Sequence, residues 1–129
     1  MRLCLDTNAY SALMRNQSGI QHCLEEAALI HIPTIVLGEL YAGFNLGSRY
    51  AENCNDLDAF LALPGVEITS PDRDVAERYG YLVRDLRRQG TPIPTNDLWI
   101  AATALETGTR LVSYDAHFQH VPGLLVISP

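Results

Sequence analysis

The sequence predicts a three-layer α/β/α fold, in which helices cover both faces of a sheet of four or five parallel strands. Short apolar runs alternate along the chain with longer segments whose apolar residues recur at helical spacing. This alternation is typical of parallel strands joined by right-handed crossovers. The 129 residues are enough for a self-sufficient core, and no repeat or low-complexity tract interrupts them. We therefore expect one domain, residues 1–129.

The first third of the chain contains two predicted strands. The apolar run Arg2–Leu5 lies before an Asp-Thr-Asn helix start, so it predicts a strand that is followed by a helix from about Ala9. Residues 21–28 predict a second helix, and residues 29–32 predict a second strand. The proline after this strand suits the first turn of a helix, which we expect over Thr34–Leu46.

The middle third contains two predicted helices around a third strand. Residues 49–63 have apolar side chains at helical spacing and end at a Pro-Gly pair, which indicates an amphipathic helix. Residues 66–68 predict a short strand. A Ser-Pro-Asp start at residues 70–72 and a closing Gly90 predict a long helix that ends at about Gln89.

The last third adds a helix and two strands. Thr95 is expected to cap a helix over about residues 96–107, and Gly108 is expected to close it. Residues 110–114 and 124–127 predict the remaining strands, because both runs are apolar and too short for helices.

The charge composition argues against several classes of α/β protein. All nine basic residues are arginines, and the chain has no lysine. Phosphate-binding P-loops need a lysine, and haloacid-dehalogenase phosphatases and response-regulator receivers characteristically use one, so these three classes are disfavoured. The net charge of −6 also repels nucleic acid at long range. Nucleic-acid binding would therefore require a metal ion or a local basic patch.

The cysteines and the apolar segments bear on the compartment. The three cysteines are odd in number and show no Cys-x-x-Cys spacing, so we expect reduced thiols rather than a disulfide framework or a structural zinc site. The N-terminal apolar run is too short for a signal peptide, and no segment approaches the roughly 20 apolar residues of a membrane span. The sequence therefore predicts a cytoplasmic protein without membrane contact.

Four carboxylates lie inside or beside apolar stretches, namely Asp6, Glu39, Asp97 and Asp115. An unpaired buried carboxylate costs several kcal/mol and has a raised pKa. Asp6 and Asp97 also suit helix starts, and Asp115 suits a turn, so each of these three alone has a local explanation. Glu39 has few local reasons to be acidic, because it lies in the middle of an apolar helix. A shared cation explains all four more simply than four separate sets of hydrogen bonds.

The predicted topology brings these acids to one edge of the sheet. Asp6 and Asp115 directly follow predicted strands and Asp97 opens a helix, so all three are expected at the carboxyl edge. Glu39 lies roughly 7 to 8 Å from that edge and can point back toward it. Because like charges raise each other's pKa, such a cluster needs a metal. Oxygen ligands suit Mg²⁺ or Mn²⁺, and such a site hydrolyses phosphodiesters by polarising the phosphate and activating water.

Four blocks of sequence closely resemble, in order and separation, the signature motifs of PIN-domain ribonucleases. They are residues 5–8 (LDTN), 37–40 (LGEL), 96–102 (NDLWIAA) and 111–118 (LVSYDAHF). Within that family, the length and the ending at residues 121–124 (VPGL) are most similar to VapC-type toxins of bacterial type II toxin–antitoxin systems. The resemblance covers essentially the whole chain.

The resemblance implies a Mg²⁺- or Mn²⁺-dependent endoribonuclease that cleaves RNA, forms a homodimer and is neutralised by a cognate VapB-type antitoxin. The catalytic, metal-binding acids would be Asp6, Glu39, Asp97 and Asp115. Residues expected to hold a water, orient an acid or cap a helix beside them are Thr7, Asn8, Asn96 and Ser113. Many relatives carry asparagine at the position of Asp115.

Other residues have both a functional and a structural interpretation. Arg84, Arg87 and Arg88 share a helix face and are candidates for RNA phosphate contacts, but cations near a helix C-terminus are favourable without any ligand. For His117 and His120, which follow a strand in a turn region, we expect surface or packing roles rather than a metal pair. Two alternatives to the ribonuclease remain: a catalytically silent PIN-fold module that binds a protein partner, and a metal-dependent DNA nuclease or phosphatase on the same acids.

Overall fold

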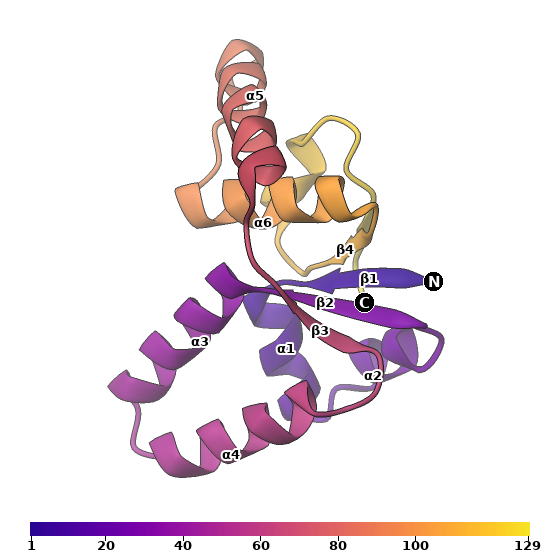
Figure 1. Ribbon diagram of the computed structural model, residues 1–129, viewed down its shortest axis with the longest axis vertical. Helices are drawn as coiled ribbons and strands as arrows, with labels where there is room; N and C mark the ends of the chain where they lie inside the picture. The colour runs from indigo at the N-terminus through magenta and orange to yellow at the C-terminus, as the bar shows by residue number, and fades with distance from the viewer.

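The computed structural model describes residues 1–129 as a five-stranded parallel sheet between two layers of helices (Figure 1). The strands are β1 (Arg2–Leu5), β2 (Leu29–Pro33), β3 (Val66–Thr69), β4 (Arg110–Val112) and β5 (Val126–Ile127). Their order in the sheet is β3-β2-β1-β4-β5, and every pairing is parallel. The predicted three-layer α/β/α fold is confirmed.

Helices cover both faces of the sheet (Figure 1). On one side lie α1 (Thr7–Met14), α2 (Ser18–Glu25), α3 (Thr34–Leu46) and α4 (Tyr50–Leu61). On the other side lie α5 (Arg73–Gln89) and α6 (Thr95–Thr107). A 3₁₀ helix, η1 (Ala116–His120), follows β4. No helix is long and apolar enough to cross a membrane, and all three cysteines are unpaired.

The central strand β1 places Asp6 at the carboxyl edge of the sheet. Residues 3–5 have no exposed surface, which is typical of a parallel strand with helices on both faces. Cys4 is aligned with His31 of β2 on one side and with Leu111 of β4 on the other. The carboxyl ends of β1 and β4 therefore lie side by side. Asp6, which follows β1, is brought next to the loop that follows β4.

Several differences from the predicted bounds arise at helix starts. β1 and α3 match their predicted bounds. The helix predicted from about Ala9 begins at Thr7, because Asp6 is its N-cap and accepts a hydrogen bond from the Ala9 N–H at 2.9 Å. The N-cap of α5 is Asp72, which accepts from the Val75 N–H at 2.9 Å, so this helix starts after the predicted Ser-Pro pair.

The C-terminal part of the chain shows similar shifts. Thr95, predicted as a cap, is the first residue of α6. Gly90 and Gly108 close α5 and α6 as predicted, with φ of 76° and 63°, in the left-handed region that favours glycine. The strand predicted over residues 110–114 ends at Val112. The remaining elements with shifted bounds are those predicted at residues 21–28, 29–32, 49–63, 66–68 and 124–127, observed as Ser18–Glu25, Leu29–Pro33, Tyr50–Leu61, Val66–Thr69 and Val126–Ile127.

His31 on β2 is a buried histidine that should make stability depend on pH. It is 6% exposed; its Nδ1 lies 2.7 Å from Thr69 Oγ1, while its Nε2 has no hydrogen-bond partner. Burial, and to a lesser extent Arg2, lower the pKa of His31 below its ordinary 6.5, against an opposing effect of Glu67. The unfolded chain therefore takes up this proton at a higher pH than the folded protein does. The free energy of unfolding should fall as the pH drops below about 6.5.

Urea denaturation on either side of this pH tests the prediction. His31→Gln should show a smaller loss of unfolding free energy on acidification than the wild type, because the variant has no imidazole to protonate. Equal pH dependence in the two proteins would contradict the prediction.

Candidate metal centre

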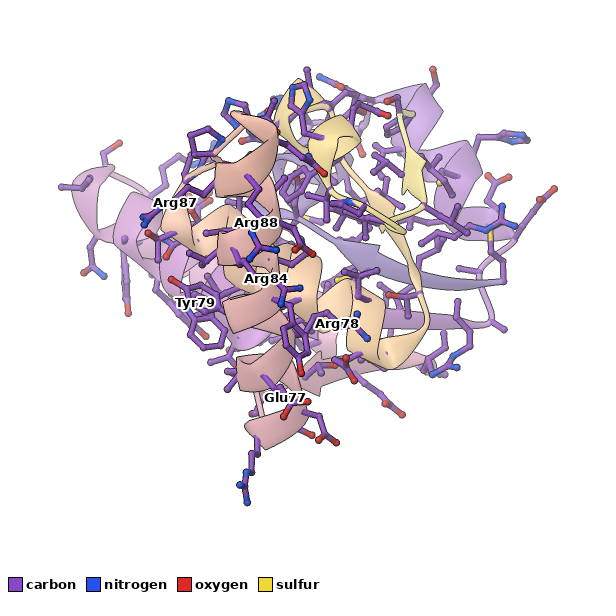
Figure 2. The ribbon with its side chains drawn as sticks, turned by 90° about the horizontal axis from the view of Figure 1, so that it is seen from above. Glu77, Arg78, Tyr79, Arg84, Arg87 and Arg88 are labelled. Atoms are coloured by element: carbon purple, nitrogen blue, oxygen red, sulfur yellow. The ribbon has the colours of Figure 1, made fainter.

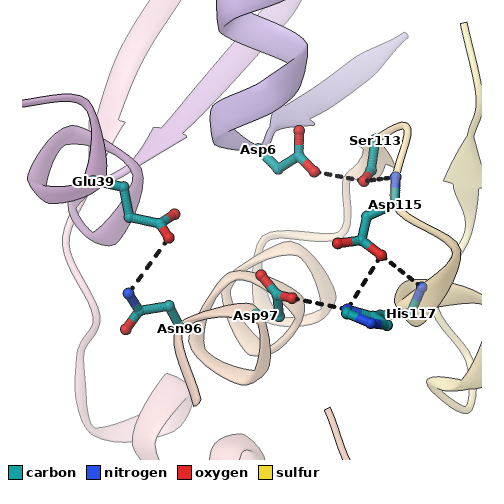
Figure 3. A network of polar contacts seen from close by, with 7 residues as sticks. All are labelled: Asp6, Glu39, Asn96, Asp97, Ser113, Asp115 and His117. Atoms are coloured by element: carbon teal, nitrogen blue, oxygen red, sulfur yellow. Dashed lines mark hydrogen bonds and ion pairs between the residues drawn. The ribbon is translucent and has the colours of Figure 1, made fainter. Parts of the chain in front are cut away.

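The structure brings all four sequence-predicted acids to the carboxyl edge of the sheet (Figure 3). Asp6 follows β1, and Glu39 lies in the middle of α3. Asp97 is in the first turn of α6. Asp115 lies three residues after the end of β4 and is the N-cap of η1, where it accepts a hydrogen bond from the His117 N–H at 2.9 Å. Segments that are far apart in the sequence thus supply the four acids.

Asp6 is the most buried of the four acids, with 5% exposure. One of its oxygens accepts the Ala9 N–H and the other accepts the Ser113 hydroxyl. Burial raises the pKa of Asp6; the hydrogen bonds from Ser113 and Ala9 lower it, and the charges of Asp97 and Asp115 raise it further, with a net increase. The ionised form of Asp6 is therefore disfavoured unless a cation is present.

Ser113 connects two of the acids. Its side chain is fully buried, and its Oγ donates to Asp6 and accepts the backbone N–H of Asp115 at 2.9 Å. This double contact also explains the early end of β4, because Ser113 turns toward Asp6 at the point where the predicted strand would continue. Ser113 thereby holds the β4–η1 loop against the end of β1.

Glu39 has contacts of its own. Its Oε1 accepts the Thr7 hydroxyl at 2.6 Å, and its Oε2 lies 3.5 Å from the Asn96 side-chain nitrogen. Two of the four residues expected to orient an acid therefore contact Glu39. Asn8, in contrast, is exposed and makes no side-chain hydrogen bond in the structure.

His117 is the member of the centre that the sequence analysis missed. Its Nδ1 lies 3.4 Å from Asp97 Oδ2 and 3.1 Å from Asp115 Oδ1 (Figure 3). The expected surface position agrees with the structure, since half of its side chain is exposed, but its contacts with two acids were not predicted. His120 is exposed, as expected. The available signal was Asp-x-His shortly after a strand: a capping aspartate turns the chain, and the histidine folds back toward it.

The electrostatics of Asp97 show that this centre fits a divalent cation. Burial raises the pKa of Asp97; the hydrogen bond with His117 lowers it, and the charges of Asp115 and Glu39 raise it. The donor set consists of carboxylate oxygens and one imidazole nitrogen, which are ordinary ligands of divalent metals. A cation at this edge would remove the repulsion that disfavours the ionised acids.

Comparisons with known proteins agree with this geometry. A family model of the PIN domain matches residues 3–124. Ribonuclease VapC2 of Rickettsia felis is 32% identical over 127 residues, which cover 95% of this chain and 93% of that protein. This chain belongs to the PIN-domain family, within its VapC group. Ribonuclease VapC1 of Haemophilus influenzae strain R2866 is 29% identical to this PIN domain over 126 residues, which cover 93% of this chain and 92% of that protein.

Solved structures show the same PIN fold. The crystal structure of VapBC2 from Rickettsia felis, bound to a promoter DNA fragment, contains a chain with a TM-score of 0.88 and 30% identity, and 98% of each chain is covered. A chain of VapBC-1 from nontypeable Haemophilus influenzae also has a TM-score of 0.88, with 26% identity and coverage of 99% of this chain and 98% of that chain. The resemblance inferred from the four sequence blocks is confirmed.

The arginines of this PIN domain that were predicted to contact RNA lie on α5 and have different surroundings (Figure 2). Arg84 donates to Asp85 at 2.9 Å and lies over the Tyr81 ring, 5.2 Å from its centroid. Arg87 lines a hollow of about 230 Å³ between α5 and the start of α6, together with Thr95. Arg88 is exposed. Of the three arginines, Arg87 is the one that shares a hollow with Thr95, a residue close in sequence to Asp97.

Proposed function

We propose that this PIN domain is a Mg²⁺- or Mn²⁺-dependent endoribonuclease and the toxin of a type II toxin–antitoxin pair. The supporting observation is the gathering of the four acids at one edge of a fold that matches VapC ribonucleases over almost its whole length. The proposed metal-binding residues are Asp6, Glu39, Asp97 and Asp115. When bound, divalent ions polarise the scissile phosphate and activate a water for in-line attack, which leaves a 5′-phosphate.

The neighbouring residues hold the acids in place. Ser113 fixes Asp6 relative to Asp115, and Thr7 fixes one oxygen of Glu39. Hydrogen bonds of this kind orient ligands and restrict their rotation before the metal binds. We propose that Thr7, Asn96 and Ser113 have this role. The contacts provide no comparable role for Asn8.

RNA must approach a protein with a net charge of −6. We propose that the bound ions and a few arginines supply the local positive potential, so that RNA binding is weak and sensitive to salt. Of the three candidate arginines, we favour Arg87, because it lines the hollow beside the start of α6. Arg84 is less available, because it is paired with Asp85.

We also propose that the protein forms a homodimer and is neutralised by a small VapB-type antitoxin. Chains with the same fold and 26% to 30% identity were solved in VapBC complexes from Rickettsia felis and Haemophilus influenzae. Those complexes support the choice of partner for this chain.

Metal removal tests the proposed activity. Structured RNA should be cleaved in Mg²⁺ or Mn²⁺, cleavage should stop in EDTA, and excess metal should restore it. Cleavage that survives chelation would contradict the proposal. Hydrolysis of single-stranded DNA or of a phosphomonoester, without RNA cleavage, would identify the nuclease or phosphatase alternative. No hydrolysis of any substrate in the presence of metal would favour the protein-binding module.

A further inference from the structure

Three residues of the centre place possible metal-ligand atoms close together, and one of these atoms is a nitrogen of His117. One ligand atom each of Asp97, Asp115 and His117 lies within 4.8 Å of the other two. Ligands at about 2.1 Å from an octahedral ion and at right angles to each other are about 3 Å apart. The separations of 3.1 Å and 3.4 Å from His117 Nδ1 to the two carboxylate oxygens are close to that value. Each carboxylate oxygen therefore lies at the distance from His117 Nδ1 that neighbouring ligands of one ion would have.

Hydrogen bonds within the protein satisfy this arrangement incompletely. Ionised carboxylates only accept, and a ring nitrogen carries at most one proton. If Nδ1 is protonated, it has one hydrogen for two carboxylates. If Nδ1 is not protonated, its lone pair faces two acceptors without a donor. A cation between the three atoms satisfies all of them.

The backbone holds His117 in this position without help from a metal. Asp115 caps η1 by accepting the His117 N–H, so the two side chains that meet at Nδ1 are also joined through the main chain. The next residue, Phe118, is 1% exposed and anchors η1 in the core. His120 lies in the same short helix but is exposed. It therefore provides a matched comparison for His117.

We propose that Nδ1 of His117 is a direct ligand of the divalent ion, together with carboxylate oxygens of Asp97 and Asp115. This inference rests on the metal dependence of the proposed function. It gives the ion both oxygen and nitrogen ligands, whereas the sequence predicted oxygen ligands only. Mg²⁺ prefers oxygen, while imidazole suits transition metals. The nitrogen therefore favours Mn²⁺ over Mg²⁺, and this preference should depend on His117.

Binding of Mn²⁺ tests the inference without any measurement of activity. The wild type, His117→Ala and His120→Ala would be titrated with Mn²⁺ and with Mg²⁺ by calorimetry, and Mn²⁺-loaded samples would be examined by pulsed EPR for coupling to ¹⁴N. We expect nitrogen coupling in the wild type and in His120→Ala, and none in His117→Ala. His117→Ala should also bind Mn²⁺ about tenfold more weakly or worse, with a smaller loss for Mg²⁺. Thermal melts without metal would verify that both variants fold.

The outcomes separate this inference from the proposed function. Bound Mn²⁺ without nitrogen coupling, or coupling that persists in His117→Ala, would overturn the role of His117 even if the wild type cleaves RNA only with metal. Nitrogen-coordinated Mn²⁺ in a protein that cleaves no RNA would support the ligand and overturn the ribonuclease. Absence of any Mn²⁺ binding would overturn both.

Discussion

Asp97→Asn is expected to lower RNA cleavage by about a thousandfold or more, because a metal ligand contributes several kcal/mol to transition-state stabilisation and about 1.4 kcal/mol corresponds to a factor of ten. Asparagine has almost the same shape but no charge. The measurement is kcat/KM on one RNA substrate with saturating Mg²⁺ or Mn²⁺.

The same substitution should not destabilise the metal-free protein. Burial, Asp115 and Glu39 hold the pKa of Asp97 above its ordinary 3.8 despite the opposing effect of His117. The folded protein therefore binds this proton more tightly than the unfolded chain, and stability falls as the pH rises through that interval. At neutral pH the ionised side chain is unfavourable, so the melting temperature of Asp97→Asn in EDTA should equal or exceed that of the wild type.

Asp58→Asn is the matched control, since Asp58 is an exposed acid on α4. It should leave both cleavage and melting temperature unchanged. Full activity in Asp97→Asn, or activity lost only together with folding, would show that Asp97 does not hold the metal.

Phe118→Ala should reduce the free energy of unfolding by roughly 3–5 kcal/mol, the usual result of deleting a large buried aromatic side chain. Phe118 is among the largest fully buried residues and is the main apolar anchor of η1. Domains of this kind are stable by about 5–15 kcal/mol, so the loss is a large fraction of the total. Because η1 carries His117 and is capped by Asp115, Mn²⁺ affinity should also fall. Urea denaturation and calorimetry provide the two measurements.

Phe44→Ala tests whether the effect depends on burial. Phe44 lies on α3 and is only partly buried. Its replacement should destabilise the protein less and leave Mn²⁺ affinity unchanged. Equal destabilisation by the two variants would contradict the proposed anchoring role of Phe118.

Local signals were sufficient for much of the architecture. The apolar run of β1 followed by Asp-Thr-Asn, and the proline before α3, mark boundaries that depend on residues near in sequence, and both elements match their predicted bounds. The alternation of strands and helices was enough to predict that the acids share one edge. The topology of a parallel sheet, rather than any single motif, thus predicted where the acids meet.

Contacts between distant residues could not be predicted in the same way. One such contact is the hydrogen bond from Ser113 to Asp6, which is 107 positions away. The bond from Thr7 to Glu39 likewise joins the start of α1 to the middle of α3. His117 was expected at the surface because it follows a strand in a turn region, and it is exposed, but its contacts with Asp97 and Asp115 were not predicted. Its side-chain direction follows from the cap that Asp115 forms, which only the folded loop reveals.

The pairing of Ser113 with Asp6 also has a consequence for biosynthesis. Asp6 is translated well before its partner, because Ser113 lies 107 positions later in the chain, next to β4. A nascent or prematurely terminated chain that stops before β4 lacks Ser113, Asp115 and His117 together. The four acids therefore cannot gather at one edge of the sheet until β4 and η1 have been translated.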